Sequence, residues 1–155
     1  AMKNFQEKMR AEQEQKSKAA LKGRAADVFE DKMSPVAGNP KGDVTLVQFF
    51  DYHCGYCKRM LPTVTQLIKQ DPNLRVVFKE LPILSEDSEL AARAALSVFM
   101  LKPEKYFDYH SVLMNRSGKY DEEMLTAEAK KLGVDEKKFK ETLSGNAVKQ
   151  ELEKT

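Results

Sequence analysis

The sequence predicts an α/β domain whose second half is helical and which follows an N-terminal helical arm. Residues 44–50 combine β-branched and aromatic side chains, which is typical of a buried strand. Apolar side chains then recur at helical spacing from Met60 to Ile68, and residues 74–81 again have the composition of a strand. A strand, a helix and a second strand in this order predict a parallel crossover, and the chain after Pro82 shows only helical patterns.

The composition indicates a soluble protein with an ordinary charged surface. Of the 155 residues, 32% are charged and 41% are hydrophobic, and no apolar run approaches the length that spans a membrane. The net charge is +2 and lysines alternate with acidic residues, which favours a solvated surface and no nucleic-acid partner. The chain opens at Ala1 with a helix-like pattern and no leader sequence, so we expect a processed or trimmed N-terminus that leaves export open.

Residues 1–32 are expected to form a helical arm. Residues 2–31 contain no proline and one glycine, and they are too polar to bury much surface against their own domain. Their apolar stripe begins at Met2, Phe5 and Met9, is almost missing from 10–18, and then resumes. Because the heptad pattern is interrupted, three interpretations stay open: a stalk that forms a homo-oligomer, a solvated arm, or a helix that folds back on the domain.

Residues 33–155 are expected to form the domain itself. Residues 33–43 are dense in proline and glycine and predict a linker within the strand–helix–strand part, which spans residues 33–83. Residues 84–155 predict a series of helices, so the sheet contains only two expected strands and the first of them keeps an open hydrophobic edge. Two aspartates are placed to cap helices in this second part, Asp121 and Asp135.

The two cysteines of the chain lie in the motif Cys54-Gly55-Tyr56-Cys57, where the first strand leads into the helix. A helix that begins at the motif places the two thiols one turn apart on one face, within reach of a disulfide. The first sulfur then faces unpaired amides at the positive end of the helix dipole, which favours the thiolate. Such a pair can accept or donate two electrons by thiol–disulfide exchange.

The segment from Val47 to Pro62 resembles the active-site segment of the thioredoxin superfamily, and in particular the DsbA-like group of bacterial envelope oxidoreductases. Lys58 directly follows the second cysteine, and Pro62 comes five residues after it, as in that superfamily. Residues 34–43 and 76–83 also resemble DsbA-like sequences. The resemblance implies a thioredoxin-like fold with a helical insertion, and the N-terminal arm is similar to that of ScsC-like members.

The resemblance also implies roles for the residues of the motif. Cys54 is expected to be the exposed, attacking thiol, and Cys57 the buried, resolving thiol. Gly55 and Tyr56 are expected to tune the reduction potential, because the intervening pair controls how well the thiolate is stabilised. This Gly-Tyr pair is similar to that of envelope disulfide isomerases as much as to that of oxidases.

Four further residues are candidate supporting groups. The family commonly has a buried acid six residues before the first cysteine, but this chain has Gln48 there. Either Glu80 or water is expected to accept the proton of the resolving thiol, or the resolving step is expected to be slow. His53 either holds charge near the nucleophile or is a partly exposed loop residue. Lys58 either favours the thiolate electrostatically or is a solvated helix charge.

The family also has a cis-proline loop that opens a strand beside the motif. Pro82 is not its equivalent because it precedes the helical part, so we expect the C-terminal strands to be absent from this chain and the sheet to be incomplete. Tyr56 and Met60 are expected to form an apolar surface for unfolded substrates, together with Tyr52 unless that residue belongs to the core.

The expected function is disulfide exchange, as oxidase, isomerase or reductase, with cysteine-containing unfolded or misfolded proteins. The resemblance places it in the periplasm or cell envelope of a bacterium, with a membrane redox partner and no cofactor. The alternative is a metal-binding or structural module that uses the cysteines without redox turnover. His53 and His110 are the only other soft metal ligands, so we expect no metal site within one chain.

Overall fold

The computed structural model describes residues 2–155, and the chain divides into two compact units, Ala1–Lys32 and Met33–Thr155. The first unit contains helix α1 (Met2–Gly23), whose residues are all exposed, and the short helix α2 (Ala25–Phe29). The single helix expected over residues 2–31 is therefore wrong. It breaks at Gly23 and Arg24, where glycine, a poor helix former, weakens the helix.

The second unit is built on a mixed sheet, which has three strands within residues 2–155. Strands β1 (Val36–Gly38), β2 (Val44–Phe50) and β3 (Leu74–Glu80) lie in the order β1-β3-β2. The predicted parallel pairing is confirmed, since β2 and β3 run parallel along their whole lengths. The outer edge of β2 has no strand partner in the part of the chain that the structure describes.

Strand β1 corrects the expectation of two strands and of a plain linker over residues 33–43. It pairs antiparallel with β3 over three residues, which is too short for the sequence to show an alternating pattern. Gly38 ends the strand with a φ of +79°, and a side chain there would meet the carbonyl oxygen of Leu74 at 2.4 Å. The proline- and glycine-rich composition therefore predicts a linker, whereas residues 36–38 form a strand because they pair with β3.

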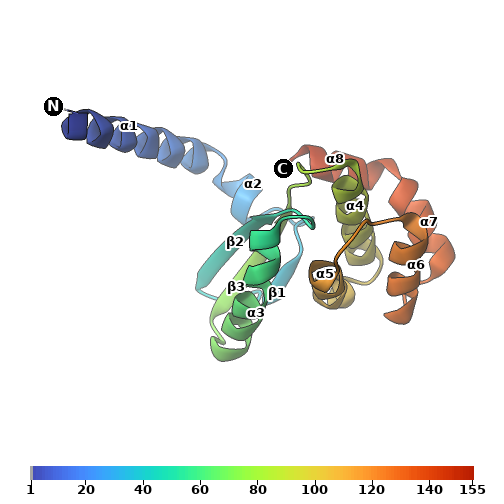
Figure 1. Ribbon diagram of the computed structural model, residues 1–155. Helices are drawn as coiled ribbons and strands as arrows, with labels where there is room; N and C mark the ends of the chain where they lie inside the picture. The colour runs from blue at the N-terminus through green and yellow to red at the C-terminus, as the bar shows by residue number, and fades with distance from the viewer. Residues whose placement is uncertain (1) are drawn as a thin grey trace. The chain divides into compact units, whose positions relative to one another are not determined.

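Helix α3 (Gly55–Gln70) carries the CxxC motif at its start and covers one face of the sheet, packing on β3 and β1 (Figure 1). Its buried side chains, Leu61 and Val64, belong to the same core as the strands. Pro62 lies inside the helix, where it cannot donate a backbone hydrogen bond.

The rest of the unit is helical, as predicted. It comprises α4 (Glu86–Leu101), the 3₁₀ turn η1 (Pro103–Lys105), α5 (Tyr106–Asn115), α6 (Glu122–Lys131), α7 (Glu136–Ser144) and α8 (Asn146–Glu153). Helix α4 lies at the centre and contacts the other four helices (Figure 1). Its buried alanines allow this close approach, and Asp121 and Asp135 cap α6 and α7 as expected.

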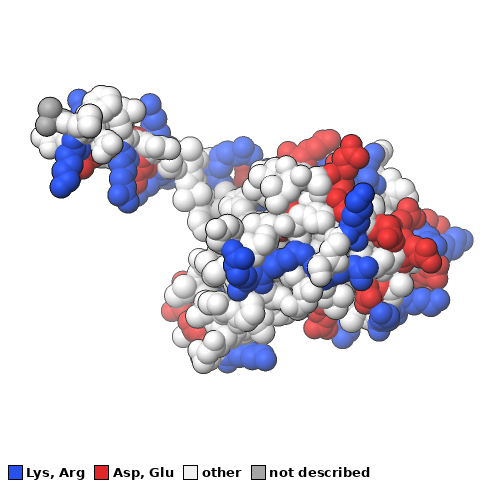
Figure 2. Space-filling view, viewed as in Figure 1, with Lys and Arg blue, Asp and Glu red and all other residues white. Residues whose placement is uncertain are grey.

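One hydrophobic core joins the sheet to the helices. Phe50 and Phe78 from the strands belong to the same cluster as Tyr109, Leu113 and Phe139 from the helices. On the surface of this unit, Lys and Arg side chains are interspersed with Asp and Glu (Figure 2). Within residues 2–155, no helix combines the length and hydrophobicity needed to cross a bilayer. The predicted α/β class is confirmed.

Candidate active site

The two cysteines lie at the start of α3, and both are free thiols that are partly buried. Cys54 is the N-cap residue, and its sulfur accepts a hydrogen bond from the backbone N–H of Cys57 at 3.3 Å. Cys57 packs against the hydrophobic core. The local sequence thus produces the arrangement that the motif predicts, with one sulfur directed at the helix N-terminus and the other directed toward the core.

The environments of the two thiols move their pKa values in opposite directions. The pKa of Cys54 is lowered, first by a hydrogen bond with the Cys57 thiol and also by the backbone amides of Cys57 and Tyr56. The pKa of Cys57 is raised, first by burial and then by its hydrogen bond with Cys54. Cys54 is therefore the better nucleophile of the pair, and Cys57 is the thiol that keeps its proton.

A buried carboxylate that the sequence analysis missed, Asp51, holds the loop before the motif. Its Oδ1 accepts hydrogen bonds from the backbone N–H of His53 at 2.7 Å and from the Ser88 hydroxyl at 2.7 Å. Its Oδ2 accepts from the backbone N–H groups of Ile83 and Leu84 at 2.9 and 3.0 Å. Asp51 thereby joins the motif loop to the β3–α4 loop and to α4.

The negative charge of Asp51 also acts on the reactive pair, because it opposes ionisation and so raises the pKa of both thiols. The available sequence signal was an aspartate placed directly after the apolar strand and three residues before Cys54. Its role depends on donors more than 30 residues away, which no local pattern shows.

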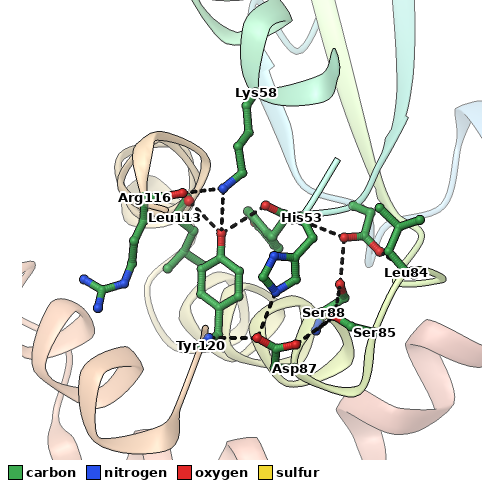
Figure 3. A network of polar contacts seen from close by, with 11 residues as sticks. His53, Lys58, Leu84, Ser85, Asp87, Ser88, Leu113, Arg116 and Tyr120 are labelled. Carbon is green, nitrogen blue, oxygen red and sulfur yellow. Dashed lines mark hydrogen bonds and ion pairs between the residues drawn. The ribbon is translucent and has the colours of Figure 1, made fainter. Parts of the chain in front are cut away.

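His53, next to the nucleophile, is paired with a residue of the helical part. Its Nε2 lies 2.8 Å from Oδ2 of Asp87, at the start of α4, and its ring packs edge-on against Tyr120 at 4.9 Å between centroids (Figure 3). The backbone N–H of Tyr120 donates to the same Asp87 oxygen at 3.0 Å. That hydrogen bond first, and then His53, hold the pKa of Asp87 well below its usual value. His53 is thus a partly exposed loop residue, 27% exposed, that Asp87 and Tyr120 hold in place, and an effect on the charge near Cys54 stays a prediction.

Lys58 is turned toward the helical part, where its ammonium group donates to the carbonyl of Arg116 and to the Tyr120 hydroxyl (Figure 3). Arg116 caps the C-terminus of α5, so the cation lies at the negative end of that helix dipole. Burial lowers the pKa of Lys58. This tether distinguishes Lys58 from a solvated helix charge, and a direct effect on the Cys54 thiolate stays a prediction.

Glu80, the candidate proton acceptor, ends β3, and Gln48, which replaces the acid of the family, lies on β2. Glu80 is buried at the end of β3, and its Oε1 accepts hydrogen bonds from the hydroxyls of Tyr106 at 2.9 Å and Tyr52 at 3.2 Å. Burial raises its pKa well above the usual value. Gln48 and Glu80 each have one buried oxygen without a hydrogen-bond partner within residues 2–155. Glu80 is bonded to tyrosines, and Asp51 is the carboxylate whose charge acts on both thiols.

The surface beside the motif is formed by some of the residues expected there. Tyr56 is 78% exposed and Met60 is 48% exposed, and the guanidinium of Arg59 lies 4.3 Å from the centroid of the Tyr56 ring. Tyr52 is 1% exposed, so it belongs to the core and not to the apolar surface expected beside the motif. Gly55 is exposed, and an added Cβ there would meet only the guanidinium of Arg59, at an ordinary contact distance of 3.9 Å.

His110 is a packed helix residue, 1% exposed, and burial lowers its pKa to about 3. Its Nδ1 lies 3.1 Å from the Tyr52 hydroxyl. Since His110 is enclosed by aromatic rings, it does not join His53 in a common site. Among residues 2–155 no three His, Cys, Asp or Glu side chains gather as a metal site would require.

Comparison with known proteins agrees with this arrangement, in which a thiol pair lies at a helix N-terminus beside a sheet with an inserted helical part. The model of the DSBA-like thioredoxin domain family matches residues 45–155. The chain belongs to this family. The thioredoxin-like fold and the resemblance to DsbA-like proteins are thereby confirmed.

Solved structures of similar proteins support the assignment. The thiol-disulfide exchange protein alpha-DsbA2 of Wolbachia pipientis is 32% identical with a TM-score of 0.83, over 92% of this chain and 76% of that one. A thioredoxin-like oxidoreductase of Silicibacter pomeroyi DSS-3 is 40% identical with a TM-score of 0.75, over 83% of this chain and 73% of that one.

A curated relative also has a name that refers to disulfide bonds. The disulfide bond formation protein D of Bacillus subtilis is 28% identical over 99 residues, which cover 61% of this chain and 45% of that protein. The chain therefore spans less than half of the length of that relative.

Proposed function

We propose that the protein exchanges disulfides with cysteine-containing unfolded or misfolded proteins of a bacterial envelope. The observation that carries this proposal is the opposite displacement of the two thiol pKa values, lowered at Cys54 and raised at Cys57. A nucleophilic thiolate beside a protonated partner is the state that a dithiol needs in order to attack a disulfide in one step and resolve it in the next.

The proposed reaction runs through a mixed disulfide. The Cys54 thiolate attacks one sulfur of a substrate disulfide, and the other substrate sulfur leaves as a thiolate. Cys57 then loses its proton to water or to a carboxylate and attacks Cys54, which releases the second substrate thiolate and leaves the Cys54–Cys57 disulfide. Two electrons pass to the substrate in this direction, and oxidation of a substrate dithiol is the reverse.

Several features support the finer parts of the proposal. The exposed side chains of Tyr56 and Met60 provide apolar surface beside Cys54, which suits an unfolded chain. A membrane redox partner in the periplasm or cell envelope would restore the oxidation state that each cycle consumes. The potential of the pair relative to that partner determines whether the protein acts as oxidase, isomerase or reductase.

The N-terminal helix supports a proposal about assembly. Helix α1 is exposed throughout, and Met2, Phe5 and Met9 lie exposed near its start. We propose that residues 2–31 form a homo-oligomer contact through this stripe. A monomeric mass in light scattering for the protein, unchanged when Phe5 and Met9 are replaced by serine, would reject it.

Trapping experiments test the assignment of the thiols. Cys54→Ser should abolish the reduction of insulin disulfides, because no attacking thiol remains. Cys57→Ser should retain the attack on a substrate disulfide but lose the resolution, so mixed disulfides with disulfide-containing substrates such as insulin should accumulate on non-reducing gels. Absence of such adducts from the Cys57 variant, or their equal yield from both variants, would refute the roles assigned here.

A further inference from the structure

The geometry points to Tyr120 as a positioning residue for disulfide exchange. We infer that this one side chain of the helical part holds the loop before Cys54 and the lysine after Cys57, and thereby sets the reduction potential of the pair. The inference rests on the proposed function, which it deepens by naming how the helical part acts on the thiols.

Tyr120 lies in the connection between α5 and α6, far from the motif in sequence, and is 3% exposed. Its hydroxyl donates to the carbonyl of Tyr52, at 3.0 Å, or to that of Leu113, at 2.9 Å (Figure 3). Tyr52 precedes Cys54 by two residues, and Leu113 belongs to α5. One hydroxyl therefore joins the motif loop to the helical part.

The same residue contacts the groups on both sides of the motif. Its ring packs against His53, and its backbone N–H donates to Asp87, the carboxylate that pairs with His53. On the other side, Lys58 Nζ lies 3.4 Å from the Tyr120 hydroxyl and 5.8 Å from the ring centroid. The residues that Tyr120 contacts thus precede Cys54 and follow Cys57, so the position of the helix N-terminus relative to its loop depends on this side chain.

These contacts favour the reduced pair. The Cys54 thiolate is stabilised by amides at the helix N-terminus, and their alignment with the sulfur requires that the loop and the first turn keep their places. Stabilisation of the thiolate stabilises the dithiol form relative to the disulfide, and so raises the reduction potential. Loosening the loop should therefore make the pair less oxidising.

The test compares two tyrosines that lose the same atom. Tyr120→Phe removes the hydroxyl beside the motif, whereas Tyr109→Phe removes a buried hydroxyl that donates to the carbonyl of Leu125, at 2.9 Å, within the helical part. Tyr109 is 0% exposed, and its ring packs edge-on against Phe139 of α7 at 6.4 Å between centroids. Both variants should lose thermal stability to a similar extent, which makes Tyr109→Phe the matched control.

The measurement is the equilibrium with glutathione, in which the dithiol and one glutathione disulfide give the protein disulfide and two glutathione thiols. We expect the hydroxyl contact to be kept in the dithiol form and lost in the disulfide form, and a hydrogen bond that only one of two states makes changes their equilibrium by about fivefold. Tyr120→Phe should therefore favour the protein disulfide by about fivefold, or about 20 mV at about 30 mV per tenfold change for a two-electron couple. Tyr109→Phe should leave the equilibrium constant unchanged.

A second variant keeps the inference testable if Tyr120→Phe does not fold. Lys58→Met removes the cation on the other side of the same contact, and it should shift the equilibrium in the same direction. The shift in the double variant should be smaller than the sum of the shifts in the two single variants, because both substitutions act through one contact.

The outcomes separate the two claims. An unchanged constant in Tyr120→Phe, or an equal change in Tyr109→Phe, overturns the inference alone, since insulin reduction by the wild-type protein tests the function independently. A wild-type protein that neither reduces insulin nor forms any mixed disulfide with glutathione overturns the proposed function together with the inference.

Discussion

Replacement of Asp51 by asparagine should destabilise the domain strongly, although the two side chains have nearly the same size. The carboxylate is 5% exposed and accepts four hydrogen bonds, from His53, Ser88, Ile83 and Leu84. An amide offers one acceptor oxygen and turns an NH₂ group toward the remaining donors, so about two bonds to a charged acceptor are lost. At about 1.5 kcal/mol for each such bond, the expected loss is about 3 kcal/mol.

Urea unfolding measures this loss, and two variants calibrate it. Ser88→Ala removes one of the four donors and should cost about 1.5 kcal/mol. Asp108→Asn also neutralises an aspartate, but one whose side chain is 54% exposed and paired with Lys105 at 3.3 Å. It should change the free energy of unfolding by less than about 0.5 kcal/mol.

The same substitution has a chemical consequence, because the charge of Asp51 raises the pKa of both thiols. Asp51→Asn should therefore lower the pH at which Cys54 becomes reactive. A variant as stable as the wild-type protein, with an unchanged pH profile of alkylation, would refute the reasoning on both counts.

Three further predictions concern ionisable groups. Near pH 7, iodoacetamide should label Cys54 before Cys57, as read by mass spectrometry of peptides, and equal rates would contradict the opposite pKa displacements. The pKa of Asp87 is depressed, so its stabilisation is present above about pH 4 and is lost as the pH falls. In urea unfolding, wild-type protein should thus lose more stability on acidification than Asp87→Asn, and parallel losses would argue against the pairing. The pKa of Glu80 is raised by burial, so its ionisation costs stability as the pH rises. The free energy of unfolding of Glu80→Gln, relative to that of the wild-type protein, should therefore rise between about pH 5 and about pH 8. A difference that stays constant over this range would show that Glu80 does not titrate there.

The CxxC motif and most elements of the domain follow from local sequence. Residues 44–50 and 74–80 form strands because β-branched and aromatic side chains suit a half-buried sheet, and helix α3 begins at Gly55 because the side chain of Cys54 caps a free amide. Asp121 and Asp135 begin helices for the same local reason. Each of these features depends on a few neighbouring residues, which is why the sequence alone predicts it.

The tertiary structure decided the rest. Strand β1 exists because β3 pairs with it, and its three residues carry no pattern of their own. The sequence shows which residue types stand at positions 51 and 120, but not their partners. Only the folded chain brings Ser88 to Asp51 and the carbonyl of Tyr52 to Tyr120. The position of the reactive pair was thus determined by the sequence by itself, whereas the groups that hold it were determined by contacts between residues more than 30 positions apart.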